Sequence, residues 1–186
     1  DLSASMDYTY AQELTKFDYA ISLAAALTYM MIHQQDPVGL ITFDEKIRFS
    51  LPPKSKRTQL PTLLALLSKL KPEGPTELAK NLRSVAAMVR HKSLLMLFSD
   101  LLTEPQPVID VLHLLRGAGH DVIVFHILDE AEVHFPFDGL LDLTEPESGQ
   151  KLIVDAPAIK ADYLDAVREL RALYKKECAS TGIDYV

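Results

Sequence analysis

Apolar positions along the chain follow two spacings, one typical of helices and one typical of buried strands. Several segments repeat apolar residues every three or four positions, which is the spacing of one helix face. Short, continuous apolar runs lie between them, as expected of strands covered on both faces of a parallel sheet. We therefore expect helices over 17–33, 60–70, 78–89, 105–116 and 158–179, and strands over 38–43, 47–49, 94–98 and 121–127.

The alternation of strand and helix predicts the fold class. It is typical of an α/β, Rossmann-like, doubly wound and mostly parallel sheet with helices on both faces. The strand at 47–49 is the exception, because Asp44 and Glu45 leave only a short turn after the preceding strand. A turn of this length joins antiparallel strands, so we expect one antiparallel edge strand.

The pattern changes before the last helix. Two apolar stretches flank the turn-forming residues at 145–149, which predicts an inserted β-hairpin near 140–154. We interpret 1–186 as a single domain with this hairpin insertion over 138–156. The chain starts without a methionine and stops in residues that look like the opening of a strand. We therefore interpret it as a fragment whose first strand and C-terminal end are missing.

Composition narrows the classes of function. The chain has 186 residues, 48% of them hydrophobic and 24% charged, which is typical of a globular domain with a real core. Its net charge of −7 argues against a nucleic-acid partner, which requires a basic surface. The single cysteine, Cys178, continues a helical apolar stripe, so we expect a buried thiol and a reducing compartment. We expect a cytoplasmic domain that makes no membrane contact, with any membrane anchor outside this fragment.

Five polar residues form a candidate metal site. Two are carboxylates and three are hydroxyls, a set of hard oxygen ligands that suits Mg²⁺ or Mn²⁺ better than zinc or copper. The carboxyl ends of parallel strands are where such sheets bind ligands, and two of the residues stand at predicted strand ends. Each residue taken alone is also typical of a helix cap or a turn. The five are Asp1, Ser3, Ser5, Thr76 and Asp100.

This set resembles the metal-ion-dependent adhesion site of von Willebrand factor A domains. The resemblance implies that the hydroxyls of Ser3, Ser5 and Thr76 meet the ion, with Asp1 and Asp100 binding directly or through water. Other segments are similar to one bacterial branch, the domain-of-unknown-function family fifty-eight, which is typically encoded beside MoxR-type AAA+ ATPases. These segments are His126–Asp129, Phe135–Phe137, the hairpin at Gly149 and Val154–Ala156.

The resemblance implies a non-enzymatic, divalent-metal-dependent protein-interaction module acting with a MoxR-type AAA+ ATPase. An incompletely neutralised Mg²⁺ or Mn²⁺ would bind an Asp or Glu side chain of the partner protein. The partner contacts we expect are Asp7, Tyr8, Phe135 and Phe137, although the two phenylalanines are also typical of an anchor that packs the hairpin onto the domain.

Two alternatives remain open at this point. A hydrolase or phosphoryl-transfer enzyme would use the same ion to activate water, but we find neither a convincing general base nor a P-loop. A purely structural domain would carry an inactive site. His126 lies within a predicted strand, where we expect a structural role for its imidazole.

Overall fold

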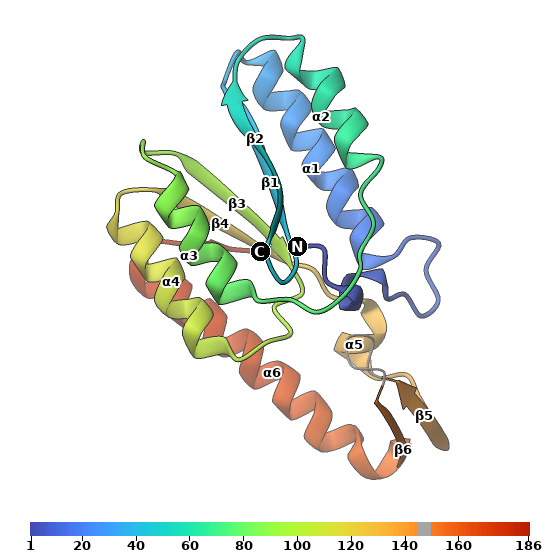
Figure 1. The fold of residues 1–186 in the computed structure, drawn as a ribbon. Helices are drawn as coiled ribbons and strands as arrows, with labels where there is room; N and C mark the ends of the chain where they lie inside the picture. The colour runs from blue at the N-terminus through green and yellow to red at the C-terminus, as the bar shows by residue number, and fades with distance from the viewer. Residues whose placement is uncertain (145–149) are drawn as a thin grey trace.

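The predicted helices and strands are present in the predicted order, and the structure adds two short helices that the apolar pattern did not predict (Figure 1). The computed structural model describes residues 1–144 and 150–186, so the predicted turn at 145–149 lies outside the described residues. The helices are α1 (Lys16–His33), α2 (Gln59–Leu67), α3 (Leu78–Met88), α4 (Pro105–Gly117), α5 (Glu130–His134) and α6 (Ala156–Thr181), and a 3₁₀ helix, η1, covers Ala4–Asp7. The strands are β1 (Val38–Phe43), β2 (Ile47–Lys54), β3 (Leu94–Ser99), β4 (Asp121–His126), β5 (Leu140–Thr144), β6 (Lys151–Asp155) and β7 (Asp184–Tyr185).

The start of helix α1 is determined by a reciprocal pair of caps. The Thr15 side chain accepts a hydrogen bond from the Asp18 backbone N–H, and the Asp18 carboxylate accepts one from the Thr15 N–H. These bonds satisfy N–H groups that have no partner inside the helix. Lys16 is thereby the first residue of the helix, and it is buried.

The strands form three separate sheets within the described residues, where the sequence analysis predicted one doubly wound sheet. Strands β3, β4 and β7 are parallel, whereas β1 and β2 form an antiparallel pair and β5 and β6 form another. The predicted antiparallel pairing of β1 with β2 and of the two hairpin strands is thus confirmed, but β2 is not an edge strand of the parallel sheet. The prediction of an α/β fold, with both helices and a parallel sheet, is also confirmed.

The first residues of the chain connect the β1–β2 pair to the parallel sheet. The Leu2 backbone N–H donates to the Phe43 carbonyl oxygen at 2.7 Å, at the end of β1. The Asp1 backbone nitrogen donates to the Phe98 carbonyl oxygen at 3.1 Å, in β3. No described strand pairs with both β1 and β3, so these two backbone bonds bridge sheets that remain separate.

Side chains from the two faces of the parallel sheet enter two different hydrophobic clusters. Leu97 and Val124 belong to the larger cluster, which packs against α3, α4 and α6. Phe98 and Phe125, the next residues along each strand, contact the smaller cluster with Phe17 of α1. Because neighbouring strand residues point to opposite faces, helices cover both faces of this sheet.

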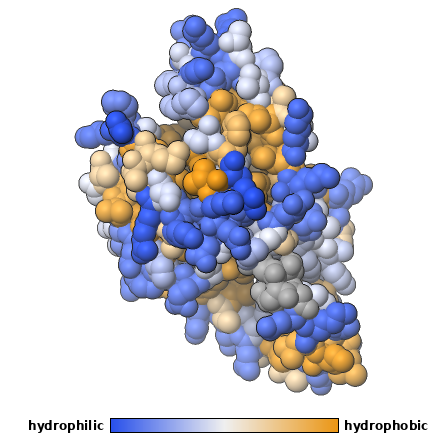
Figure 2. Space-filling view, viewed as in Figure 1, coloured by the Kyte–Doolittle hydropathy of each residue, from blue (hydrophilic) through white to orange (hydrophobic). Residues whose placement is uncertain are grey.

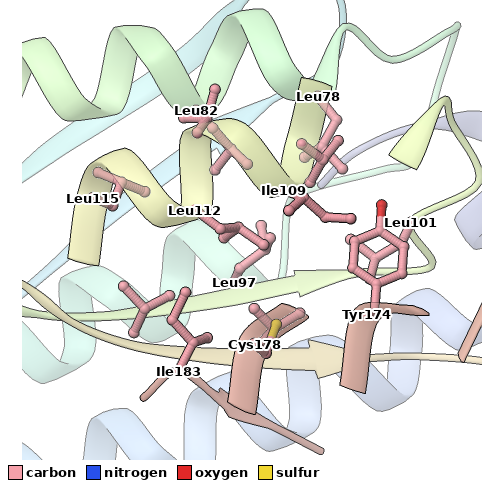
Figure 3. Close-up of a cluster of buried hydrophobic side chains, with 14 of the residues drawn as sticks. Leu78, Leu82, Leu97, Leu101, Ile109, Leu112, Leu115, Tyr174, Cys178 and Ile183 are labelled. Carbon is pink, nitrogen blue, oxygen red and sulfur yellow. The ribbon is translucent and has the colours of Figure 1, made fainter. Parts of the chain in front are cut away.

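Most side chains of the larger cluster come from helices α3, α4 and α6 (Figure 3). Cys178 and Tyr174 enter it from α6, and both are fully buried. The expected burial of the thiol is therefore confirmed. Burial raises the pKa of the Cys178 thiol to about 11.

Cys178 should therefore resist alkylation in the folded protein. At pH 8 we expect iodoacetamide to label it roughly 100-fold more slowly than in denaturant, because the raised pKa lowers the thiolate fraction and packing excludes the reagent. Mass spectrometry of timed samples measures the two rates. Comparable rates with and without denaturant would contradict the burial of this side chain.

The hairpin of β5 and β6 projects from the rest of the molecule beside the start of α6 (Figure 1). Figure 2 shows an apolar patch at this end, where Leu140, Leu152 and Ile153 are each more than 60% exposed. Isolated two-stranded ribbons are marginally stable in water, so the hairpin depends on its base for support. The described helices include none that is long and apolar enough to cross a membrane.

Candidate functional site

The structure brings Asp1 and Asp100 to the same end of strand β3. The Asp1 carboxylate accepts a hydrogen bond from the Ser99 hydroxyl at 2.6 Å, and Ser99 is the residue directly before Asp100. The other Asp1 oxygen accepts from the Ser3 backbone N–H at 3.0 Å. The hydroxyls of Ser3 and Ser5 lie 3.0 Å apart and are hydrogen-bonded to each other. Four of the five predicted residues therefore meet at one polar end of the sheet.

Thr76 belongs to a loop that runs beside this end of the sheet. The Ala4 N–H donates to the Gly74 carbonyl oxygen, and the Glu73 N–H donates to the Leu2 carbonyl oxygen, both at 2.8 Å. These two bonds hold the loop against the N-terminal segment. The Thr76 hydroxyl oxygen is buried and has no hydrogen-bond partner among the described residues. The loop is thus placed as predicted, but its hydroxyl is not joined to the other four residues.

A lysine that was not predicted as a site residue contacts Asp100. The Lys16 ammonium lies 2.9 Å from a carboxylate oxygen of Asp100 and 2.7 Å from one of Glu132. The side chains of Lys16 and Asp100 are only 2% and 1% exposed. We call these three residues the Lys16 cluster. It ties the start of α1 to the end of β3 and to α5.

Local structure holds Glu132 in this cluster. Asp129 caps α5 by accepting a hydrogen bond from the Ala131 N–H at 2.8 Å, and Glu132 accepts one from the Asp129 N–H at 2.7 Å. This capping box directs one Glu132 oxygen to the backbone and leaves the other for Lys16. Glu132 therefore stabilises a helix end and a buried ammonium at the same time.

The prediction of a Mg²⁺ or Mn²⁺ cofactor is contradicted. The described residues contain no group of three or more His, Cys, Asp or Glu side chains that could hold a metal ion. The oxygens of the predicted site also have other partners, since Ser99 and the Ser3 N–H engage Asp1. Lys16 and the Leu102 N–H engage Asp100. The donor set therefore does not fit a divalent ion, because an ammonium of the same chain neutralises the carboxylate expected to bind it.

His126 supports the Asp100 backbone from the neighbouring strand. Its Nε2 lies 2.9 Å from the Asp100 carbonyl oxygen, and its Nδ1 lies 2.5 Å from the Tyr185 hydroxyl. A neutral imidazole that donates from Nε2 to Asp100 and accepts at Nδ1 from Tyr185 satisfies both contacts. Burial lowers the pKa of His126 to about 4, which favours this neutral form. These contacts give the imidazole the structural role that we expected.

The four predicted partner contacts fall into two environments. Asp7 is exposed, and Tyr8 is half-buried with its ring 5.8 Å from the Lys16 ammonium. Phe135 is 3% exposed and packs against Tyr163 of α6, with ring centroids 4.8 Å apart. Phe135 therefore anchors the segment before the hairpin, as in the alternative interpretation, and its ring is not available to a partner protein.

Phe137 connects the same segment to the loop after η1. Its ring packs edge-on against Phe135 at 5.1 Å and against the exposed Tyr10 at 4.8 Å. The Tyr10 N–H also approaches the Asp129 carboxylate at 3.4 Å. The loop after η1 and the segment before the hairpin thus form one continuous surface beside the Lys16 cluster.

The fold and the site define an α/β domain with a buried polar cluster, in which one ammonium is shared by two carboxylates, at the carboxyl end of its parallel sheet. A family model described as "Protein of unknown function DUF58" matches residues 1–173, and the chain belongs to this family.

Curated relatives come from mycobacteria. The uncharacterized proteins Rv1480 of Mycobacterium tuberculosis (strain H37Rv) and Mb1516 of Mycobacterium bovis are each 27% identical to the chain over 180 residues. The aligned region covers 92% of the chain and 55% of each relative, so the chain spans about half the length of these proteins.

Two solved structures from Bacteroides share the fold. An aerotolerance-related membrane protein of Bacteroides fragilis has a TM-score of 0.63 at 16% identity, covering 100% of this chain and 87% of that one. The conserved hypothetical protein BatB of Bacteroides thetaiotaomicron has a TM-score of 0.58 at 14% identity, covering 98% and 95%. At these identities the likeness is one of fold alone.

Proposed function

We propose that the chain is a non-enzymatic protein-interaction module that works without a divalent metal ion. The observation that carries this proposal is the Lys16 cluster, in which a buried ammonium neutralises the Asp100 carboxylate that the sequence had suggested for a metal. A buried ion pair with additional hydrogen bonds is typical of a rigid support. It does not offer the free nucleophile or base that a catalytic role requires.

The surface around the cluster supports a binding role. The loop after η1 is largely exposed and carries two large apolar side chains, Tyr10 and Leu14, each a little more than half exposed. Exposed aromatic and apolar side chains beside polar ones are typical of protein-binding surfaces. This surface is connected to the Lys16 cluster through Tyr8 and to Phe135 through the Tyr10–Phe137 contact.

We propose that the domain is von Willebrand A-like and Rossmann-like, that it acts in the cytoplasm, and that a MoxR-type AAA+ ATPase is its partner. Helices on both faces of the parallel sheet support the first part. Capture of a partner carboxylate by a bound ion is not retained, since it requires the metal site that the structure contradicts. The alternative of a metal-dependent enzyme is not retained either, because it requires the same ion.

The stability of the domain should not respond to divalent ions. A domain that binds Mg²⁺ gains about 2.7 kcal/mol when the free ion is at 100 times its dissociation constant. We expect instead that thermal unfolding followed by circular dichroism is unchanged between 10 mM MgCl₂, roughly a hundred times a 0.1 mM dissociation constant, and excess EDTA. A saturable rise in melting temperature that Asp100→Asn abolishes would overturn the metal-independent proposal.

Binding to the proposed partner is tested by calorimetry with a purified, nucleotide-free MoxR-type ATPase from the same genome. Without nucleotide, magnesium has no role in the ATPase site, so titrations in EDTA and in magnesium are comparable. We expect the same affinity in both buffers. Binding in magnesium alone would make the interaction metal-dependent, and absence of binding in both would reject this partner.

A further inference from the structure

Two adjoining hollows lie next to the polar cluster. The larger encloses about 510 Å³ between α1, the end of α2 and the loop that follows it. The smaller encloses about 310 Å³ and is lined by Ala4, Asp7, Tyr8 and Pro72. Asp7 and Pro72 line both hollows, so the two are neighbours. We call this surface the Asp7 groove.

The floor of the Asp7 groove is apolar. Phe17 and Leu67 are buried at its base, and Ile21 and Leu70 are half-buried along its walls. Phe17 also belongs to the smaller hydrophobic cluster of the domain, and Ile21 and Leu70 pack against that cluster. A side chain that enters the groove would therefore contact the hydrophobic interior directly, which favours an aliphatic anchor on the occupant.

The rim of the groove is acidic. Asp7, Asp18 and Glu73 line it, and Lys71 is the one basic residue among the described residues that line it. The carboxylates of Asp7 and Glu73 form no hydrogen bond or ion pair with any described residue, whereas Asp18 is partly engaged in capping α1. Lys16 cannot offset this charge at the surface, because its ammonium is buried between Asp100 and Glu132.

We infer that the Asp7 groove binds a segment of the partner protein that carries a basic residue next to an aliphatic one. This inference rests on the proposed function and specifies the chemistry of the partner. It reverses the expectation from the sequence, in which a bound cation would attract an acidic side chain. With the cation replaced by a buried ammonium, the exposed charge beside the site is negative and complements Arg or Lys.

The smaller hollow places the occupant next to the polar cluster. Ala4 lies between Ser3 and Ser5, and Tyr8 lies against the Lys16 ammonium. An extended segment would seat its aliphatic side chain between α1 and α2 and its basic side chain near Asp7 and Glu73. The bond from the Glu73 N–H to the Leu2 carbonyl oxygen fixes the backbone at this part of the rim before binding, which lowers the cost of ordering it.

Two short fluorescent peptides, identical apart from a central Leu-Arg-Leu or Leu-Glu-Leu, test the inference by fluorescence anisotropy. We expect the Arg peptide to bind about tenfold more tightly, because each surface ion pair contributes modestly and two rim carboxylates are free. Raising the salt concentration should reduce this preference. Equal binding of both peptides, or a preference for the Glu peptide, would overturn the inference.

Matched charge variants locate the binding site. Asp7→Asn combined with Glu73→Gln should abolish the preference for the Arg peptide without disturbing the apolar floor. Asp162→Asn combined with Glu169→Gln removes the same charge from the exposed face of α6 and should leave the preference unchanged. An equal loss in both double variants would show a general charge effect and reject the groove as the site.

The same variants separate this inference from the proposed function. If the wild-type chain binds the MoxR-type ATPase and the Asp7→Asn, Glu73→Gln variant binds it equally well, the interaction module stands and the groove inference fails. If the wild-type chain binds the Arg peptide through the groove but not the ATPase, the partner assignment fails and the groove stands. If it binds neither the peptides nor the ATPase, both fail.

Discussion

Replacing Lys16 with Met is expected to lower the free energy of unfolding by about 3–5 kcal/mol, because it leaves a buried carboxylate without its counter-ion. Asp100 is 1% exposed and depends on the Lys16 ammonium at 2.9 Å for neutralisation. Glu132, at 16% exposure, is better able to reach water. Urea unfolding followed by circular dichroism measures the change.

The control for this variant is Lys176→Met on helix α6. The Lys176 side chain is 81% exposed, and its contact with Glu177 is long, at 3.9 Å. Its replacement should change stability by no more than about 0.5 kcal/mol. The double variant Lys16→Met, Asp100→Asn should cost less than the sum of its single variants, because neutral Asn removes the unpaired charge. Additive losses would contradict a direct Lys16–Asp100 interaction.

The position of the candidate site was predictable from the sequence, but its chemistry was not. Asp1 and Asp100 were expected at carboxyl ends of strands, and parallel strands present those ends on one edge of the sheet. Lys16 gave no comparable signal, since a lysine directly after a helix cap is usually a solvated residue. Only the packing of α1 against the sheet shows that its ammonium points inward. Its one trace in the sequence is that it is the only Lys or Arg in a mostly apolar helix.

The spacing of apolar residues predicted where strands and helices begin and end better than it predicted how the strands are arranged in sheets. The apolar run 94–98 correctly predicted β3, although Leu94, the first residue of the strand, is 42% exposed. The separation of β1 from β3 depends on which strands are neighbours, whereas a repeat of apolar residues indicates only which face of a strand is buried. Helix α5 is five residues long, too short to produce a helical period. Its capping box, Asp129 with Glu132, is the signal that was available.

Phe135 illustrates how an exposed-looking motif becomes an anchor. It follows α5 with a φ of 46°, in the left-handed region that non-glycine residues rarely adopt. That backbone conformation turns the chain at the end of the helix and directs the aromatic ring onto Tyr163. A sequence of Phe-Pro-Phe does not distinguish this inward turn from an exposed patch, because both require large apolar side chains. The tertiary contact with α6 decides between them.

The second large expected effect is a loss of stability in acid that originates at His126. Burial lowers the pKa of His126 to about 4 in the folded protein, against 6.5 for the ordinary side chain. Between these two pH values the unfolded chain binds a proton that the folded chain does not, so stability falls as the pH is lowered through this window. A difference of this size corresponds to about 3 kcal/mol, present in full above pH 6.5 and lost near pH 4.

The variant His126→Gln isolates this contribution from that of the carboxylates, which titrate in both proteins. An amide N–H at this position retains a donor for the Asp100 carbonyl oxygen but takes up no proton in this range. From pH 7 to pH 4 we expect the wild type to lose about 3 kcal/mol more unfolding free energy than the variant loses. His91→Gln, at an exposed position, should follow the wild-type curve. If the wild-type and His126→Gln curves run parallel, the imidazole is not held neutral by its burial, and its contacts with Asp100 and Tyr185 do not depend on its charge.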